Sequence, residues 1–149
     1  MRACTTPEDG CQTQEMKEHA MEKPRILIVD DNDMLTDMWR VLFEQTRRFE
    51  IGIENNGMAV LETARAFRPD LIFMDVCLPG KGGGEIAEEL AADPVLKSTP
   101  IVFLTGISKE EAAERYGSGQ HMVLTKPVRL HEILACAELF FPETVLKVA

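Results

Sequence analysis

Residues 26–33 read ILIVDDND, four apolar residues followed by a polar run that holds three aspartates. A short apolar run rich in β-branched residues is typical of a buried strand, since a buried helix needs a longer stretch. The side chains at positions 31 to 33 all accept hydrogen bonds, so any of them could cap a helix behind the strand. We therefore predict a buried strand over residues 26–29, which ends in Asp30, and a helix directly after it.

Similar apolar runs recur along the chain and alternate with longer amphipathic stretches. The expected strands cover residues 26–29, 49–54, 71–74, 101–104 and 122–124. Helical spacing of apolar residues predicts helices around residues 34–43, 59–67, 85–92, 109–116 and 130–141. Strands that alternate with helices are typical of a doubly wound α/β fold, in which helices cover both faces of a parallel sheet.

The length of 149 residues fits one domain. We expect a flexible N-terminal tail over residues 1–23, the folded domain over residues 24–141 and a short C-terminal tail over residues 142–149. Because only eight residues follow the last expected helix, we expect a stand-alone domain. Its output would then be contact with another protein or onward transfer of a chemical group.

The composition and the charge disfavour several functions. The chain has 16 Lys and Arg against 25 Asp and Glu, a formal net charge of −9, which disfavours direct binding of nucleic acid. No apolar run is long enough to span a bilayer, so membrane insertion is not expected. The four cysteines show no zinc-ligand or disulfide pattern. We expect a cytoplasmic protein.

Chemistry-bearing residues follow four of the expected strands. They are Asp30 with Asp31, then Asp75, Thr105 and Lys126. Ligands of open α/β sheets bind outside the carboxyl ends of the strands, so these side chains are expected to converge. Crowded carboxylates favour Mg²⁺, while an ammonium and a hydroxyl can neutralise and bind a phosphoryl group. Each residue alone has an ordinary structural explanation, but the combination indicates a phosphoryl-transfer site.

The chain resembles the response-regulator receiver domains of two-component signalling over about residues 24–141. The matching motifs are ILIVDD at 26–31, DLIFMD at 70–75 with Leu78-Pro79 behind it, PIVFLT at 100–105 and LTKP at 124–127. The resemblance implies a flavodoxin-like fold with five parallel strands in the order 2-1-3-4-5. It also implies a phosphorylation-dependent switch or phosphorelay component that is not an enzyme in the usual sense, although it assists its own phosphorylation and slow autodephosphorylation.

The resemblance assigns a role to each matching residue. Asp75 would be the phosphoacceptor, supplied by a histidine kinase or a phosphotransfer histidine, and an unknown downstream protein would read the result. Thr105 would turn its hydroxyl onto the phosphoryl group and Lys126 would pair with it. The Lys126–Pro127 peptide bond would be cis. Asp30 would hold Mg²⁺ through water and Asp31 would hold it directly, with Asp75 and the backbone carbonyl of Cys77 as the other protein ligands.

Three departures from the family pattern affect the expected mechanism. Val123 stands where many receivers have Tyr or Phe, so signalling would run through movements after Thr105. Glycines at positions 82–84 lower helix propensity and predict a late start of the following helix. Cys77 and Ile107 orient water poorly beside the site, which predicts slow autodephosphorylation.

Other interpretations remain open at this point. An aspartate-nucleophile phosphatase of the haloacid-dehalogenase type also uses a strand aspartate, a Thr and a Lys, but it needs a later acidic pair. A flavodoxin-like cofactor binder is disfavoured because Asp30 and Asp31 would repel phosphate. A receiver-like domain that works without phosphorylation is disfavoured by the full set of site residues. We further expect a buried thiol at Cys77 and core or half-buried methionines at positions 34, 38, 58 and 74.

Overall fold

The computed structural model describes residues 23–108, 110–111, 114 and 121–143. The strands are β1 (Arg25–Val29), β2 (Glu50–Glu54), β3 (Leu71–Asp75), β4 (Ile101–Thr105) and β5 (Met122–Thr125). The helices are α2 (Asp33–Thr46), α3 (Val60–Phe67), α4 (Gly83–Ala92) and α6 (Leu130–Phe140), with a 3₁₀ turn η1 (Gly57–Ala59) before α3. The predicted N-terminal tail lies outside the described residues except for Lys23. So do most of the predicted helix at 109–116 and residues 144–149 of the predicted C-terminal tail.

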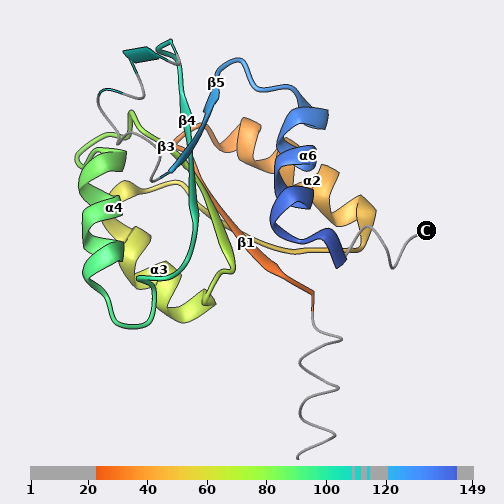
Figure 1. Ribbon diagram of the computed structural model, residues 1–149, viewed down its shortest axis with the longest axis horizontal. Coiled ribbons are helices and arrows are strands. Elements are labelled where there is room, and N and C mark those ends of the chain that lie inside the picture. The colour runs from red at the N-terminus through yellow and green to blue at the C-terminus, as the bar shows by residue number, and fades with distance from the viewer. Residues whose placement is uncertain (1–22, 109, 112–113, 115–120, 144–149) are drawn as a thin grey trace, which may run out of the picture.

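The five strands form one parallel sheet in the order β2-β1-β3-β4-β5, as expected. The three inner strands carry the fully apolar runs because both of their faces are covered. In Figure 1, α3 and α4 lie on one side of the sheet, and α2 and α6 lie on the other. The flavodoxin-like fold class is therefore confirmed.

Alternation along each strand divides the interior into two hydrophobic layers. One layer packs under α3 and α4; its strand residues include Leu27, Val29, Ile72, Met74 and Phe103. The other packs under α2 and α6; its members include Ile28, Trp39, Phe43, Phe73, Leu104 and Ile133. These layers hold the strands rigidly and so fix the positions of the residues that follow them.

Three of the four methionines are not fillers, contrary to the prediction. Met74 is fully buried in β3, but Met34, Met38 and Met58 are 78%, 53% and 62% exposed. The buried side of α2 instead runs through Trp39 and Phe43. Because residues 34 and 38 lie on the opposite side of the helix from this pair, their side chains face solvent.

The prediction of a late start for α4 is also wrong, because this helix begins at Gly83. A Cβ at that position would lie 2.8 Å from Val76 Cα and 2.9 Å from Asp75 O. The Gly83 N–H donates to Val76 O at 3.0 Å. Glycine here permits a close approach of backbone to backbone, which outweighs its low helix propensity.

Candidate functional site

The sheet topology brings three charged side chains together at one edge. Asp30 follows β1, Asp75 is the last residue of β3, and Lys126 follows β5. Asp30 continues the alternation that puts Ile28 in the layer under α2 and α6, and Asp75 continues that of Phe73. The predicted convergence of these residues is therefore observed.

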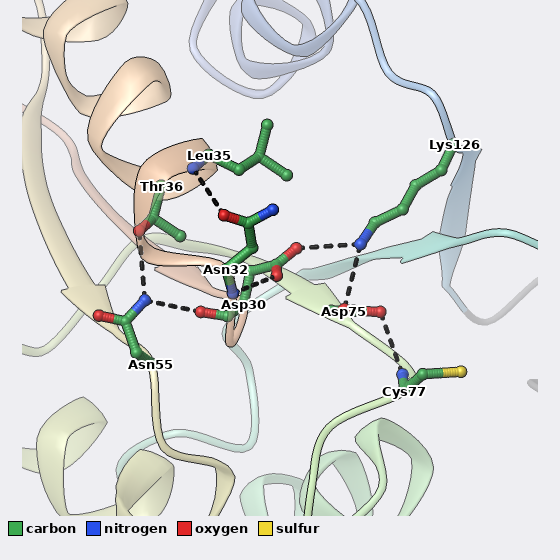
Figure 2. Close-up of polar contacts among 8 residues, drawn as sticks. All are labelled: Asp30, Asn32, Leu35, Thr36, Asn55, Asp75, Cys77 and Lys126. Carbon is green, nitrogen blue, oxygen red and sulfur yellow. Dashed lines mark hydrogen bonds and ion pairs between the residues drawn. The ribbon is translucent and has the colours of Figure 1, made fainter.

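Lys126 connects the two carboxylates, as Figure 2 shows. Its Nζ lies 3.0 Å from Asp30 Oδ2 and 3.1 Å from Asp75 Oδ2. The other oxygen of each carboxylate accepts a backbone N–H: Asn32 donates to Asp30 Oδ1 at 2.9 Å, and Cys77 donates to Asp75 Oδ1 at 3.0 Å. Each carboxylate is thus held in a fixed orientation from both sides.

The carboxylates of Asp30 and Asp75 are buried, and burial disfavours a charged group. Asp30 is 1% exposed and Asp75 is 5% exposed. Burial raises the pKa of Asp30 above its ordinary value, although the Asn32 N–H and Lys126 partly offset it. Burial alone would lower the pKa of Lys126, but its hydrogen bonds to Asp30 and Asp75 outweigh that effect and raise the pKa. Lys126 therefore keeps its charge at neutral pH.

The donor set fits a hard divalent cation. One carboxylate oxygen from each of Asp30, Asp31 and Asp75 lies within 4.8 Å of the others. Asp31 is exposed, so solvent reaches the group from that side. Three carboxylates with one ammonium leave an excess of negative charge, and oxygen donors with room for water suit Mg²⁺.

Thr105 lies at the same edge of the sheet, but its side chain is engaged elsewhere. It is fully buried. Its Oγ1 accepts the Ile107 N–H at 3.2 Å. Thr105 follows Phe103 in the alternation of β4 and so belongs to the layer under α3 and α4.

Cys77 and Ile107, the two residues expected to flank the site, differ in exposure. The Cys77 side chain is exposed, so the prediction of a buried thiol is wrong. Its N–H donates to Asp75 Oδ1, and its thiol points away from that carboxylate (Figure 2). Ile107 is half-buried. The peptide bond between Lys126 and Pro127 is cis.

Two asparagines lie beside Asp30, and of the three candidate caps at positions 31 to 33 it is Asn32 that caps α2. Its Oδ1 accepts the Leu35 N–H at 3.2 Å. Asn55 Nδ2 donates to Asp30 O at 2.7 Å and to Thr36 Oγ1 at 3.2 Å. The partners of Asn55 lie 25 and 19 residues before it in the chain, so no local sequence signal indicates this role.

A comparison with known families identifies the class of the protein. Residues 26–138 match the response regulator receiver domain. The chain therefore belongs to the receiver-domain family of response regulators, whose members act in phosphorylation-based signalling. Receiver domains bind Mg²⁺ at an acidic pocket and take phosphoryl groups from histidine kinases or phosphotransfer proteins. This membership favours signalling over the phosphatase alternative.

Individual relatives agree with this family. The chain is 33% identical to the polar-differentiation response regulator DivK of Brucella anthropi over 104 residues, which are 69% of this chain and 84% of DivK. It is 31% identical to the transcriptional regulatory protein PdtaR of Mycobacterium tuberculosis over 117 residues, which are 77% of this chain and 55% of PdtaR. The chemotaxis response regulator CheY4 of Vibrio cholerae superposes with a TM-score of 0.72 at 26% identity, covering 80% of this chain and all of CheY4.

Within the part of the chain that the structure describes, every helix is too short or too polar to traverse a bilayer.

Proposed function

We propose that this receiver domain works by accepting a phosphoryl group on Asp75 from the phosphohistidine of a histidine kinase or phosphotransfer protein. The observation that carries the proposal is the Lys126 ammonium, which lies 3.0 Å from Asp30 and 3.1 Å from Asp75. A carboxylate nucleophile, two further carboxylates and a fixed cation make up what phosphoryl transfer to an acid requires.

The transfer exchanges one bond for another. A carboxylate oxygen of Asp75 attacks phosphorus as the bond between phosphorus and the donor's imidazole nitrogen breaks, and the electron pair of that bond stays on the nitrogen. The product is an acyl phosphate on Asp75. Lys126 pairs with the phosphoryl oxygens, and the Cys77 N–H continues to orient the carboxylate.

Asp30, Asp31 and Asp75 would hold Mg²⁺, with the backbone carbonyl of Cys77 as a further protein ligand. Both oxygens of Asp30 are already hydrogen-bonded, which supports contact through water. Asp31 is exposed and supports direct contact. When bound, Mg²⁺ neutralises charge on the transferring group. The acidic residues of this chain therefore set the position of the incoming phosphate.

The signal would leave the site through Thr105. Its hydroxyl turns from the Ile107 N–H to the phosphoryl group, and the backbone after β4 follows. Val123 offers no aromatic ring to complete this movement. The changed surface would then bind a downstream protein, or the phosphoryl group would pass onward in a relay.

Phosphorylation with a small donor tests the proposal without a partner protein. Phosphoramidate with Mg²⁺ should add one phosphoryl group to the wild type, measured by intact mass. It should add none to Asp75→Asn, while Asp37→Asn, a surface control on α2, should behave like the wild type. Sustained hydrolysis of p-nitrophenyl phosphate that survives Asp75→Asn but not Asp31→Asn would instead support the phosphatase alternative.

A further inference from the structure

Thr125, the last residue of β5, has a hydroxyl that lacks a partner. Its Oγ1 is buried and makes no hydrogen bond, a condition that only Trp39 Nε1 shares among side-chain atoms of the described residues. Buried polar atoms are nearly always bonded, because an unbonded one loses its hydration without compensation. In this conformation the unbonded Thr125 hydroxyl therefore destabilises the folded protein.

The position of Thr125 connects it to the moving part of the site. In the parallel pairing of β4 with β5, Thr105 is the register partner of Thr125, as Phe103 is of Val123. Phe103 and Val123 both pack in the layer under α3 and α4. Since alternate residues share a face, the hydroxyls of Thr105 and Thr125 lie on that same face, on strands about 4.8 Å apart.

The Ile107 N–H is the hydrogen-bond partner of the first of these hydroxyls. It donates to Thr105 Oγ1 at 3.2 Å. The Thr105 backbone is itself held, because the Lys126 N–H donates to Thr105 O at 2.6 Å. When the Thr105 hydroxyl turns toward a phosphoryl group, the Ile107 N–H loses its acceptor. Val123, which shares this face of β5 with Thr125, has no polar side-chain atom to replace it.

We propose that Thr125 is a positioning residue that accepts the Ile107 N–H when the Thr105 hydroxyl turns to the phosphoryl group. This inference rests on the proposed function, since it requires Thr105 to turn. The exchange replaces one hydrogen bond with another and gives Thr125 Oγ1 a partner in the phosphorylated conformation only. The phosphorylated conformation is thereby favoured, and the segment after β4 is fixed in its new place.

The test compares three variants in beryllofluoride binding with Mg²⁺, since beryllofluoride mimics a phosphoryl group on aspartate. Thr125→Val keeps the side-chain shape and removes the hydroxyl, while Thr125→Ser keeps the hydroxyl. Thr99→Val is the matched control, because Thr99 precedes β4 at the opposite edge of the sheet. We expect about five-fold weaker binding for Thr125→Val, the value of one net hydrogen bond, and binding within about two-fold of the wild type for the other two.

A second measurement separates positioning from simple packing. With beryllofluoride bound, the Ile107 amide should exchange its hydrogen slowly in the wild type and in Thr125→Ser, and several-fold faster in Thr125→Val. Without beryllofluoride, Thr125→Val should be at least as stable to urea as the wild type.

Three outcomes would overturn the inference, and they differ in whether they also reject the proposed function. Unchanged beryllofluoride affinity and unchanged Ile107 exchange in Thr125→Val would reject the role of Thr125 alone, as would an equal loss of stability with and without beryllofluoride. Failure of the wild type to bind beryllofluoride would reject the proposed function together with this inference.

Discussion

Lys126 Nζ lies 3.1 Å from Asp75 Oδ2, although 51 residues separate them in the chain. The same ammonium lies 3.0 Å from Asp30 Oδ2. The cation therefore occupies the space between two carboxylates that we propose as Mg²⁺ ligands. It must stabilise the site without metal and oppose the metal electrostatically at the same time.

Removal of the Lys126 charge should change metal binding and phosphorylation in opposite directions. Lys126→Gln should bind Mg²⁺ a few-fold more tightly by calorimetry, because one positive charge beside the carboxylates is lost. Its phosphorylation by phosphoramidate should be at least about ten-fold slower, because no ammonium pairs with the phosphoryl oxygens. Weaker Mg²⁺ binding by the variant would show that Lys126 organises the carboxylates more than it repels the metal.

The close contact at Gly83 predicts a cost for any side chain there. Gly83→Ala should destabilise the protein by about 1–3 kcal/mol in urea unfolding, because its Cβ would meet backbone atoms of Val76 and Asp75 below 3.0 Å. It should also slow phosphorylation, since the backbone of Asp75 must shift. Gly82→Ala is the control, because its Cβ meets nothing nearer than Val76 O at 3.8 Å. Equal stability of the two variants would contradict the contact.

We expect Asp93, which directly follows α4, to stabilise the folded protein at neutral pH and to lose this effect in acid. Its Oδ2 accepts a hydrogen bond from Arg65 Nε at 2.5 Å, and its Oδ1 accepts one from the Val95 N–H at 2.8 Å. The Arg65 hydrogen bond first, and then the backbone N–H, lower the pKa of Asp93 below its ordinary value of about 4. A lowered pKa in the folded state stabilises the protein above the unfolded pKa, and the stabilisation is lost as pH falls through the folded value.

Asp93→Asn should therefore lower the free energy of unfolding at neutral pH. The difference from the wild type should shrink as the pH falls below about 4. Urea unfolding across this range measures it. A difference that stays constant with pH would assign the effect to the shape of the side chain and not to its charge.

The two residues that flank the site predict a long-lived phosphoryl group. Cys77 is exposed but offers only a thiol, and Ile107 is apolar, so neither orients an attacking water well. Cys77→Asn and Ile107→Glu should each accelerate dephosphorylation several-fold. The rate is measured as the loss of the phosphorylated mass after the donor is removed. Unchanged decay in both variants would mean that these positions do not control hydrolysis in this chain.

The strands and their polar ends were predictable because each signal is local. ILIV before Asp30 and LIFM before Asp75 combine strand propensity with burial on both faces. The strand order came from the family resemblance, since alternation alone does not specify neighbours. The convergence of Asp30, Asp75 and Lys126 was expected without the order, because ligands of open α/β sheets bind at the carboxyl ends of the strands.

Features that depend on tertiary contacts were not predictable. The early start of α4 at Gly83 depends on a close approach to Val76, and the anchoring of Asp30 by Asn55 depends on a partner 25 residues away. The exposure of Met34 depends on which side of α2 faces the sheet. In each case the local sequence favoured one state, and a distant contact selected another.

The most direct test of the account is the identity of the phosphorylated residue. The wild type is phosphorylated with phosphoramidate and Mg²⁺, the acyl phosphate is reduced with borohydride, and the modified peptide is located by mass spectrometry. We expect a single modified residue, Asp75, and no modification when Mg²⁺ is chelated. Modification at Asp30, Asp31 or another residue, or full modification without Mg²⁺, would contradict it.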